Sequence, residues 1–176
     1  MVLLCAVLFH GCSVKNQSPN VSKSEVETLA QDIMALSKKI DKKEAYDLAK
    51  EALTYPKVLA KEYDLVTPAN YHNMLIHLGY RKRGWCYHWA EDMMAHLKAR
   101  KYKTIDLRWG VSGKAGPDEH NSVVVVAKGA LFNTGILLDP WRNSGDLFWS
   151  KIDKDEKFEW VENKQRTTFL GTAKNF

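Results

Sequence analysis

The spacing of hydrophobic residues changes part-way along this chain. Between residues 24 and 79 they recur every three or four positions, as on one face of a helix, with Val26, Leu29 and Ile33 in the first run. From residue 104 onward, apolar runs such as "TIDLRWGV" and "HNSVVVVA" are short, rich in β-branched residues and bounded by polar or turn-forming residues, which is typical of strands. Helices followed by strands indicate an α+β domain with an antiparallel sheet.

A single domain accounts for this pattern, because the chain has 176 residues. Its residues are 45% hydrophobic and 27% charged, a composition that supports a packed core and argues against disorder. The formal net charge is +5. No zinc-finger spacing and no aromatic–basic RNA-binding pattern accompanies this charge. We therefore interpret it as a solvated basic face and expect no nucleic-acid partner.

Capping and breaking residues divide the helical portion. Ser24 and Glu27 match a capping box at its start. Pro56 is expected to break or kink the second helical run, because proline lacks the N–H that an interior helical position donates. Gly79 supplies the last stop signal before the next helix, which we expect over residues 86–100.

The strand-rich portion follows that helix. We expect strands over residues 104–111, 120–127 and 135–139, with a hairpin turn at "NTG" between the last two. The runs "KFEWVEN" and "RTTFL" are interpreted as additional strands. The domain therefore spans residues 24–176, with a helical portion over 24–79 and a second portion over 80–176.

The N-terminus has the anatomy of an export signal. Residues 2–9, "VLLCAVLF", are apolar but too few to span a membrane as a helix, and a polar, turn-rich stretch follows them. Gly11-Cys12 resembles the lipobox of bacterial lipoproteins, whose cysteine is lipidated and becomes the mature N-terminus. We expect a signal peptide over residues 1–11, a lipid anchor at Cys12, a tether over 12–23 and a place in the bacterial cell envelope. The alternatives are an ordinary cleaved signal or a buried N-terminal strand.

Counting cysteines isolates Cys86. The chain has three cysteines; Cys5 leaves with a cleaved signal, and the sulfur of Cys12 carries the lipid. Cys86 then has no partner for an intramolecular disulfide, and a single thiol in an exported protein indicates a reactive residue. The thiol also stands at the start of a helix, where the macrodipole stabilises the nucleophilic thiolate. The alternative is a small buried hydrophobe.

A cysteine nucleophile needs a base, and the base needs a group that orients it. His88 is nearest in sequence, but residues two apart on a helix do not face each other. His72 and His77 would serve only if the preceding helix folded back over the site. His120 is the better candidate base, since it begins an apolar strand at a sheet edge. Asp139, which ends the neighbouring strand, is the candidate orienting group; its alternative is an ordinary turn aspartate.

Three segments carry a family resemblance. In this order, "GWCYHWAEDM", "EHNSVVVV" and "LLDPW" resemble the Gly-x-Cys-aromatic, His-led strand and Asp-Pro segments of the transglutaminase-like superfamily of papain-fold cysteine enzymes. The resemblance implies a papain-like core, in which a central helix carrying the cysteine packs against an antiparallel sheet. It implies that Cys86 is the nucleophile, His120 the general base and Asp139 the residue that holds the imidazole. "RGWC" is also similar to a shorter segment of arylamine N-acetyltransferases.

The sequence departs from the family pattern in two places. Asn121 and Ser122 follow the histidine, where the family often has tryptophan. No oxyanion donor is obvious upstream of Cys86, whose backbone N–H is one expected donor. The candidates for a second donor, or for a wall of the substrate cleft, are Tyr80, Trp85, Asn73 and Trp141.

The resemblance implies thiol-dependent acyl transfer from a peptide or protein amide, through a thioester on Cys86. Hydrolysis is the default over transfer to an amine, because water needs no second binding site, and we expect no cofactor. One alternative is a non-catalytic envelope-binding lipoprotein on the same fold. Another is a zinc site formed by Cys86, His88, His120 and Asp139, but no CxxC or HExxH spacing supports it and we expect no metal.

Overall fold

The computed structural model describes residues 21–113 and 118–172. The expected signal peptide, the lipidation site at Cys12 and most of the tether lie outside these residues. The helices are α1 (Lys23–Ala35), α2 (Lys42–Glu62), α3 (Ala69–His77), α4 (Cys86–Ala99) and α5 (Lys164–Thr172). The strands are β1 (Ile105–Ser112), β2 (His120–Ala127), β3 (Ile136–Asn143), β4 (Asp146–Lys151) and β5 (Val161–Glu162), and two short 3-10 helices are η1 (Phe132–Thr134) and η2 (Ile152–Lys154).

The five strands form one antiparallel sheet in the order β4-β3-β2-β1-β5. The α+β class with an antiparallel sheet is thus confirmed, whereas the likeness of the core to the papain fold stays a prediction. Strand β2, which begins at His120, lies at the centre of the sheet and not at the sheet edge where we expected it. It pairs with β1 along its whole length, from Ile105 opposite Ala127 to Ser112 opposite His120. Its pairing with β3 covers only residues 123–125, so the start of β2 extends beyond that ladder.

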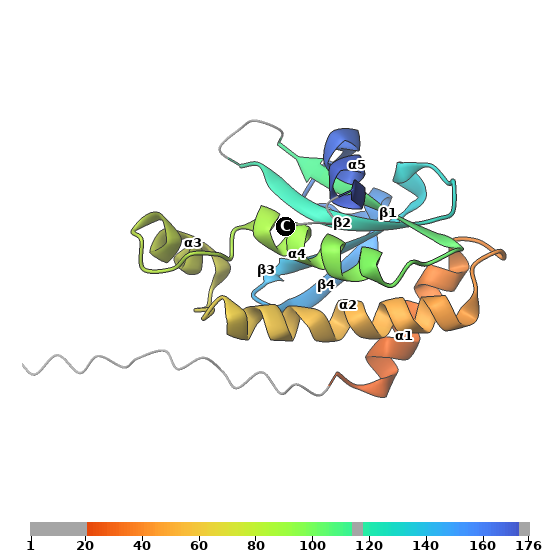
Figure 1. Ribbon diagram of the computed structural model, residues 1–176, viewed down its shortest axis with the longest axis horizontal. Helices are drawn as coiled ribbons and strands as arrows, with labels where there is room; N and C mark the ends of the chain where they lie inside the picture. The colour runs from red at the N-terminus through yellow and green to blue at the C-terminus, as the bar shows by residue number, and fades with distance from the viewer. Residues whose placement is uncertain (1–20, 114–117, 173–176) are drawn as a thin grey trace, which may run out of the picture.

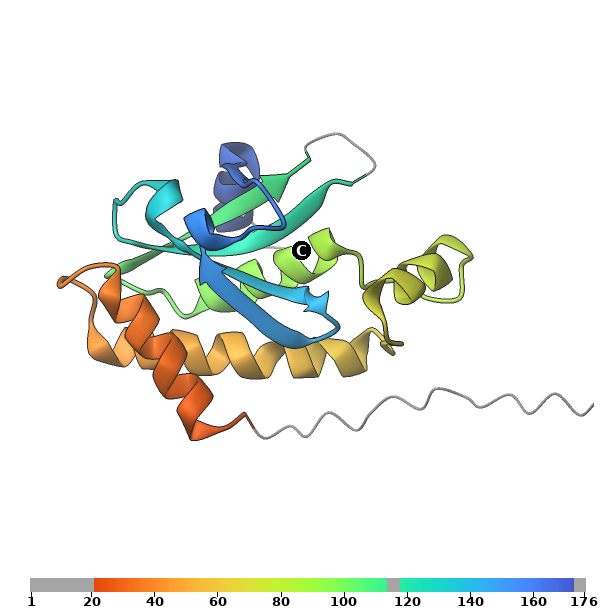
Figure 2. The ribbon, with the colours of Figure 1, turned by 180° about the vertical axis from the view of Figure 1, so that it is seen from behind.

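Helix α4 packs on one face of the sheet. Figure 1 shows it in front of β2, with α2 running along its lower side, and Figure 2, the view from behind, shows α1 crossing in front of α2. Every residue of β2 is buried, because both faces of the strand are covered. Val123 and Val125 join the larger core with α4, whereas Val124 and Val126 join a smaller cluster that includes Trp160 on the opposite face.

The start of α1 differs from expectation. Ser22 is its N-cap residue: the Ser22 Oγ accepts the Glu25 N–H at 3.2 Å, and the Glu25 carboxylate accepts the Ser22 N–H at 3.0 Å. The capping box predicted at Ser24 and Glu27 is therefore wrong by two residues. The stretch "SKSEVE" holds the Ser-x-x-Glu pattern twice, and the earlier copy is the one used.

Pro56 does not break α2, so the break that we expected as one of two outcomes, a break or a kink, is wrong. The helix runs from Lys42 to Glu62 with the proline inside it. Pro56 lies on the buried face of the helix with Leu53 and Leu59. Packing of this long face offsets the missing hydrogen bond, whose loss alone costs about 3 kcal/mol.

The C-terminal portion also differs from expectation. The "RTTFL" segment lies in α5, not in a strand, and β5 has only two residues. Asn163 explains the helix, because its side-chain oxygen accepts the Arg166 N–H at 3.1 Å as a helix cap does. The sequence pattern did not predict β4, which pairs with β3.

Candidate active site

Cys86 is the first residue of α4, and rings on both sides of the preceding loop fix where this helix begins. The His88 Nδ1 accepts the N–H groups of Gly84 and Trp85, at 3.1 and 3.3 Å. The Trp89 Nε1 donates to the Gly84 carbonyl oxygen at 3.0 Å. From α3, the His72 Nε2 lies 2.8 Å from the carbonyl oxygen of the residue before Gly84. The loop is therefore held by both α3 and α4.

Gly84 is required by this arrangement. Its φ of +128° lies in a region that side-chain-bearing residues rarely adopt. A Cβ atom at this position would lie 2.3 Å from the His72 Nε2, too close for any side chain. The glycine thus allows the close approach of α3 that brings the loop to Cys86.

His88 is a structural residue of this loop. Burial, followed by repulsion from the Arg83 guanidinium, lowers the pKa of His88 from 6.5 to about 4. The neutral ring then offers a lone pair to the two backbone donors. As helical geometry predicts, His88 is not the partner of Cys86, although the two are separated by a single residue.

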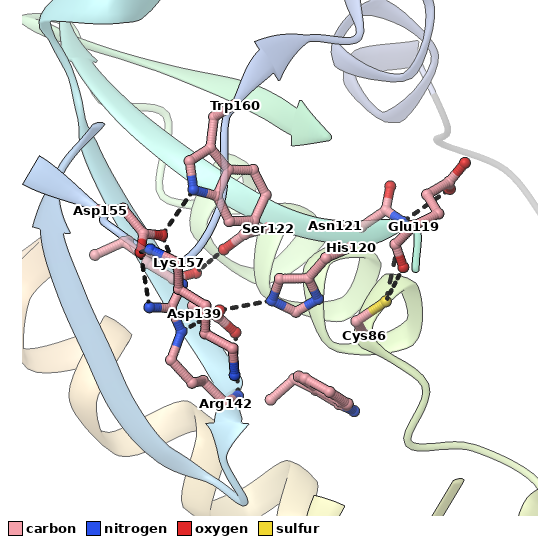
Figure 3. A network of polar contacts seen from close by, with 12 residues as sticks. Cys86, Glu119, His120, Asn121, Ser122, Asp139, Arg142, Asp155, Lys157 and Trp160 are labelled. Carbon is pink, nitrogen blue, oxygen red and sulfur yellow. Dashed lines mark hydrogen bonds and ion pairs between the residues drawn. The ribbon is translucent and has the colours of Figure 1, made fainter. Parts of the chain in front are cut away.

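His120 lies between Cys86 and Asp139 (Figure 3). Its Nε2 is 2.7 Å from the Asp139 Oδ2, and both side chains are buried, with only 3% of His120 exposed. The other ring nitrogen is turned to the Cys86 side. Since a carboxylate accepts a proton-bearing nitrogen, a neutral His120 carries its hydrogen on Nε2 and presents the Nδ1 lone pair to the thiol.

The surroundings of His120 favour its charged form. Burial lowers the pKa, but the hydrogen bonds and charge interactions with Asp139 and Cys86 outweigh it and raise the pKa from 6.5 to about 9. Three aromatic rings surround the imidazole: Trp141, Phe158 and Trp160 have centroids 4.8, 4.5 and 5.4 Å from its own. The rings exclude water and leave the imidazole edges to Cys86 and Asp139.

The thiol has two further polar neighbours. The Cys86 Sγ donates to the Glu119 carbonyl oxygen at 3.6 Å, and the Asn121 Nδ2 lies 4.0 Å from the sulfur. Asn121 is itself fixed, because its Oδ1 accepts the Trp109 Nε1–H at 2.7 Å and its Nδ2 donates to the Glu119 carboxylate at 3.0 Å. The residue that departs from the family pattern is therefore part of the site.

Asp139 has a second cationic partner that sequence reasoning missed. The Arg142 Nε donates to the Asp139 Oδ2 at 3.1 Å, and the Arg142 backbone N–H donates to the Oδ1 at 3.2 Å. The pairing of β3 with β4 shifts register between Asp139 and Asn143. This irregularity, which contains Pro140, lets Arg142 turn back to Asp139. The Asp-x-x-Arg spacing in "DPWR" is the sequence pattern that could have indicated the contact.

The candidate cleft residues have different environments. Trp141 packs on His120, and its Nε1 donates to the Asn73 Oδ1 at 3.4 Å, so Asn73 is linked to the candidate triad through Trp141. Trp85 is the N-cap residue of α4. Tyr80 is 70% exposed, and no contact of the described residues links its side chain to the candidate triad.

The zinc alternative needs His88 beside Cys86, His120 and Asp139. His88 instead turns its Nδ1 to the loop backbone. Within residues 21–113 and 118–172, no group of three His, Cys, Asp or Glu side chains has a geometry that could hold a metal ion.

No protein-family model, curated protein or solved structure matches this chain. The family resemblance therefore rests on the three sequence segments and on the geometry around Cys86. None of the helices in the described part of the chain is both long enough and apolar enough to cross a membrane.

Proposed function

We propose that this chain is a thiol-dependent enzyme that transfers the acyl group of a peptide or protein amide through a thioester on Cys86. Hydrolysis is the default outcome. The single observation that carries the proposal is the placement of His120, with its Nε2 2.7 Å from the Asp139 carboxylate and its other ring nitrogen on the Cys86 side (Figure 3).

The chemistry follows from this placement. His120 takes the thiol proton on its Nδ1, and the thiolate attacks the substrate carbonyl carbon. A C–S bond forms while the carbonyl π electrons move to oxygen. The backbone N–H of Cys86 has no acceptor within α4, because it belongs to the first helical turn, and is available to that oxyanion. When the carbonyl reforms, the C–N bond breaks and the imidazolium gives its proton to the leaving amine.

Deacylation uses the same residues. His120 removes a proton from water, the hydroxide oxygen bonds to the thioester carbon, and the C–S bond breaks with return of the proton to sulfur. Asp139 accepts the Nε2–H throughout and stabilises the imidazolium in each half-reaction. An amine in place of water would make the reaction a transamidation.

The export and lipid anchor belong to the same proposal. They are supported by the apolar run of residues 2–9 and by Gly11-Cys12, and with them the proposed site of action is the bacterial envelope. The alternative function on this fold is a binding lipoprotein that does not use its thiol.

Alkylation of Cys86 by iodoacetamide tests the proposal, with the rate measured from pH 4 to 10 on the Cys86 peptide by mass spectrometry. In the wild type the rate should rise well below pH 8.5, where a free thiol ionises. In His120→Gln this early rise should disappear, with a loss of at least about 100-fold in rate at pH 6, because a shift of two pH units is a factor of 100.

His96→Gln is the matched control, since His96 also pairs with a carboxylate, Glu51 at 2.7 Å, farther along the same helix. This variant should keep the wild-type profile. A chromogenic ester, p-nitrophenyl acetate, then tests acyl transfer: an acetyl group should form on Cys86 and be lost on standing. A wild-type thiol that ionises only near pH 8.5, or that never acylates, would support the binding lipoprotein instead.

A further inference from the structure

Beyond the candidate triad, a second buried ion pair lies behind Asp139. Arg142 donates through its Nη1 and Nη2 to the two carboxylate oxygens of Asp155, at 3.0 and 2.6 Å. The same guanidinium donates through its Nε to Asp139. One guanidinium therefore bridges two carboxylates, as Figure 3 shows. The Asp155 side chain is only 2% exposed.

The contacts continue from Asp155 back to the imidazole. Asp155 accepts the Trp160 Nε1–H at 2.8 Å and the Lys157 backbone N–H at 3.1 Å. The Trp160 ring, together with that of Phe158, packs on His120. Hydrogen bonds and ring contacts thus lead from His120 through Asp139, Arg142, Asp155 and Trp160 and back to His120. Among the rings over the imidazole, Trp160 is the one that donates a hydrogen bond to the carboxylate of Asp155.

We propose that Asp155 is a positioning residue of the catalytic centre, which acts through Arg142 by balancing its charge and so allows Asp139 to hold a protonated His120. This inference rests on the proposed function of Cys86. It assigns to the ion pair a specific electrostatic task beyond stabilising the fold.

The reason is the net charge of the buried group. With a neutral imidazole, the carboxylates of Asp139 and Asp155 and the guanidinium of Arg142 carry a net charge of −1. Transfer of the Cys86 proton to His120 places a positive charge next to this group and neutralises it. Without the Asp155 carboxylate, the guanidinium would cancel the charge of Asp139, and an imidazolium would add an unbalanced charge in a buried place.

The other groups near His120 do not supply this balance. The charged and titratable groups around the imidazole are Cys86 from α4, Asp139 and Arg142 from β3, Asp155 and Lys157 from the segment after η2, and Glu119, which directly precedes β2. Lys157 lies over Phe158 at 5.2 Å and adds a further positive charge. Asp155 stays ionised: burial raises its pKa, but hydrogen bonds from Arg142 and Trp160 outweigh this and hold the pKa below 3.8.

Charge variants of the pair test the inference, with iodoacetamide alkylation of Cys86 in the full chain as the readout. Asp155→Asn should raise the midpoint pH of alkylation by about one unit, which is a tenfold lower rate at pH 6. The double variant Arg142→Gln/Asp155→Asn restores the net charge of −1, so its midpoint should return toward that of the wild type. A merely structural ion pair predicts the same shift, or a larger one, in the double variant.

Asp47→Asn is the matched control. Asp47 also binds an arginine, Arg100, through two nitrogens, and accepts an aromatic donor, the Tyr102 hydroxyl at 2.8 Å. Its loss should leave the midpoint unchanged. Trp160→Phe removes a hydrogen bond from Asp155 but no charge, and it too should leave the midpoint within a few tenths of a unit.

The outcomes separate the two proposals. A wild-type thiol without the His120-dependent rise in alkylation overturns the proposed function itself. A wild type with that rise, together with an unchanged Asp155→Asn, overturns only the role of Asp155. The double variant, which keeps the net charge of −1, and Trp160→Phe keep the test decisive where Asp155→Asn does not fold, since a shifted midpoint in either one contradicts the charge-balance argument.

Discussion

His88 and His120 are two buried histidines near the same thiol, and their pKa values are shifted in opposite directions. The pKa of His88 is lowered to about 4, whereas that of His120 is raised to about 9. Burial lowers the pKa in both cases. The difference therefore comes from the partners. His88 accepts two backbone N–H groups and lies near Arg83, whereas His120 donates to a carboxylate.

Two histidines near the start of α4 therefore differ in protonation because they have different hydrogen-bond partners. Backbone donors need a lone pair, so they keep His88 neutral and make it a fixed part of the loop before Cys86. A carboxylate acceptor stabilises a proton, as the base role that we propose for His120 requires. His88 is the nearer of the two histidines to Cys86 in sequence, but the hydrogen-bond partners make His120 the better candidate base.

Among the variants that we propose, a substitution at Gly84 should have the largest effect on the environment of His88. Gly84→Ala places a Cβ against His72 in a strained backbone, so we expect a loss of about 4 kcal/mol in the free energy of unfolding. The donors to His88 would move, and its pKa should rise toward 6.5. Urea unfolding and NMR titration of the ring measure the two effects.

Gly129→Ala is the control for this variant. Gly129 also has a positive φ, of +73°, but a Cβ there meets nothing within 4 Å. Its substitution should cost only about 1 kcal/mol, the cost of the backbone conformation. Equal losses in the two variants would show that the contact with His72 does not matter.

The pH dependence of the free energy of unfolding should distinguish His120 from His88 above neutral pH. Because the folded pKa of His120 lies above 6.5, its contribution to stability is complete below pH 6.5 and is lost as the pH rises through 9. The free energy of unfolding of the wild type relative to His120→Gln should therefore fall by about 3 kcal/mol between pH 6 and 10. A difference that stays flat over this range would contradict the charged state that we assign to His120.

His88 should show the smaller effect, with the opposite sign. Its folded pKa lies below 6.5, so the unfolded chain binds a proton first as the pH falls. The wild type should lose stability relative to His88→Gln between pH 6.5 and 4, by less than the His120 effect. If the wild type and His88→Gln change in free energy of unfolding by the same amount over this interval, the ring of His88 is not held neutral in the folded protein.

Local sequence patterns predicted the elements that carry the candidate triad. The β-branched run after His120 and the helix that begins at Cys86 lie where the period and the breaking residues indicate. Strand β3, however, continues through Asp139 and Pro140 to Asn143, so the expected end of this strand at Asp139 is wrong. Asp139 and His120 then meet because antiparallel pairing of β2 with β3 follows from the hairpin between them.

The sequence could not predict what depends on contacts between distant segments. Asp155 follows a short 3-10 helix and meets Arg142 only because the segment after η2 folds over the sheet. Two of the three rings that cover His120 are Phe158 and Trp160, in a stretch that we expected to be a strand. The local spacing of hydrophobic residues contains no information about such contacts, because they depend on how distant segments fold together.

The position of Cys86 affects how readily the protein is damaged by oxidation. Cys86 is the only cysteine within residues 21–113 and 118–172, so in this part of the chain no second thiol is present to trap a sulfenic acid as a disulfide. Oxidation by peroxide would then proceed to acids that cannot be reduced. The residue is only 8% exposed, and its Sγ donates to the Glu119 carbonyl oxygen. The buried position of the sulfur for which we propose acyl transfer thus also limits the access of oxidants to it.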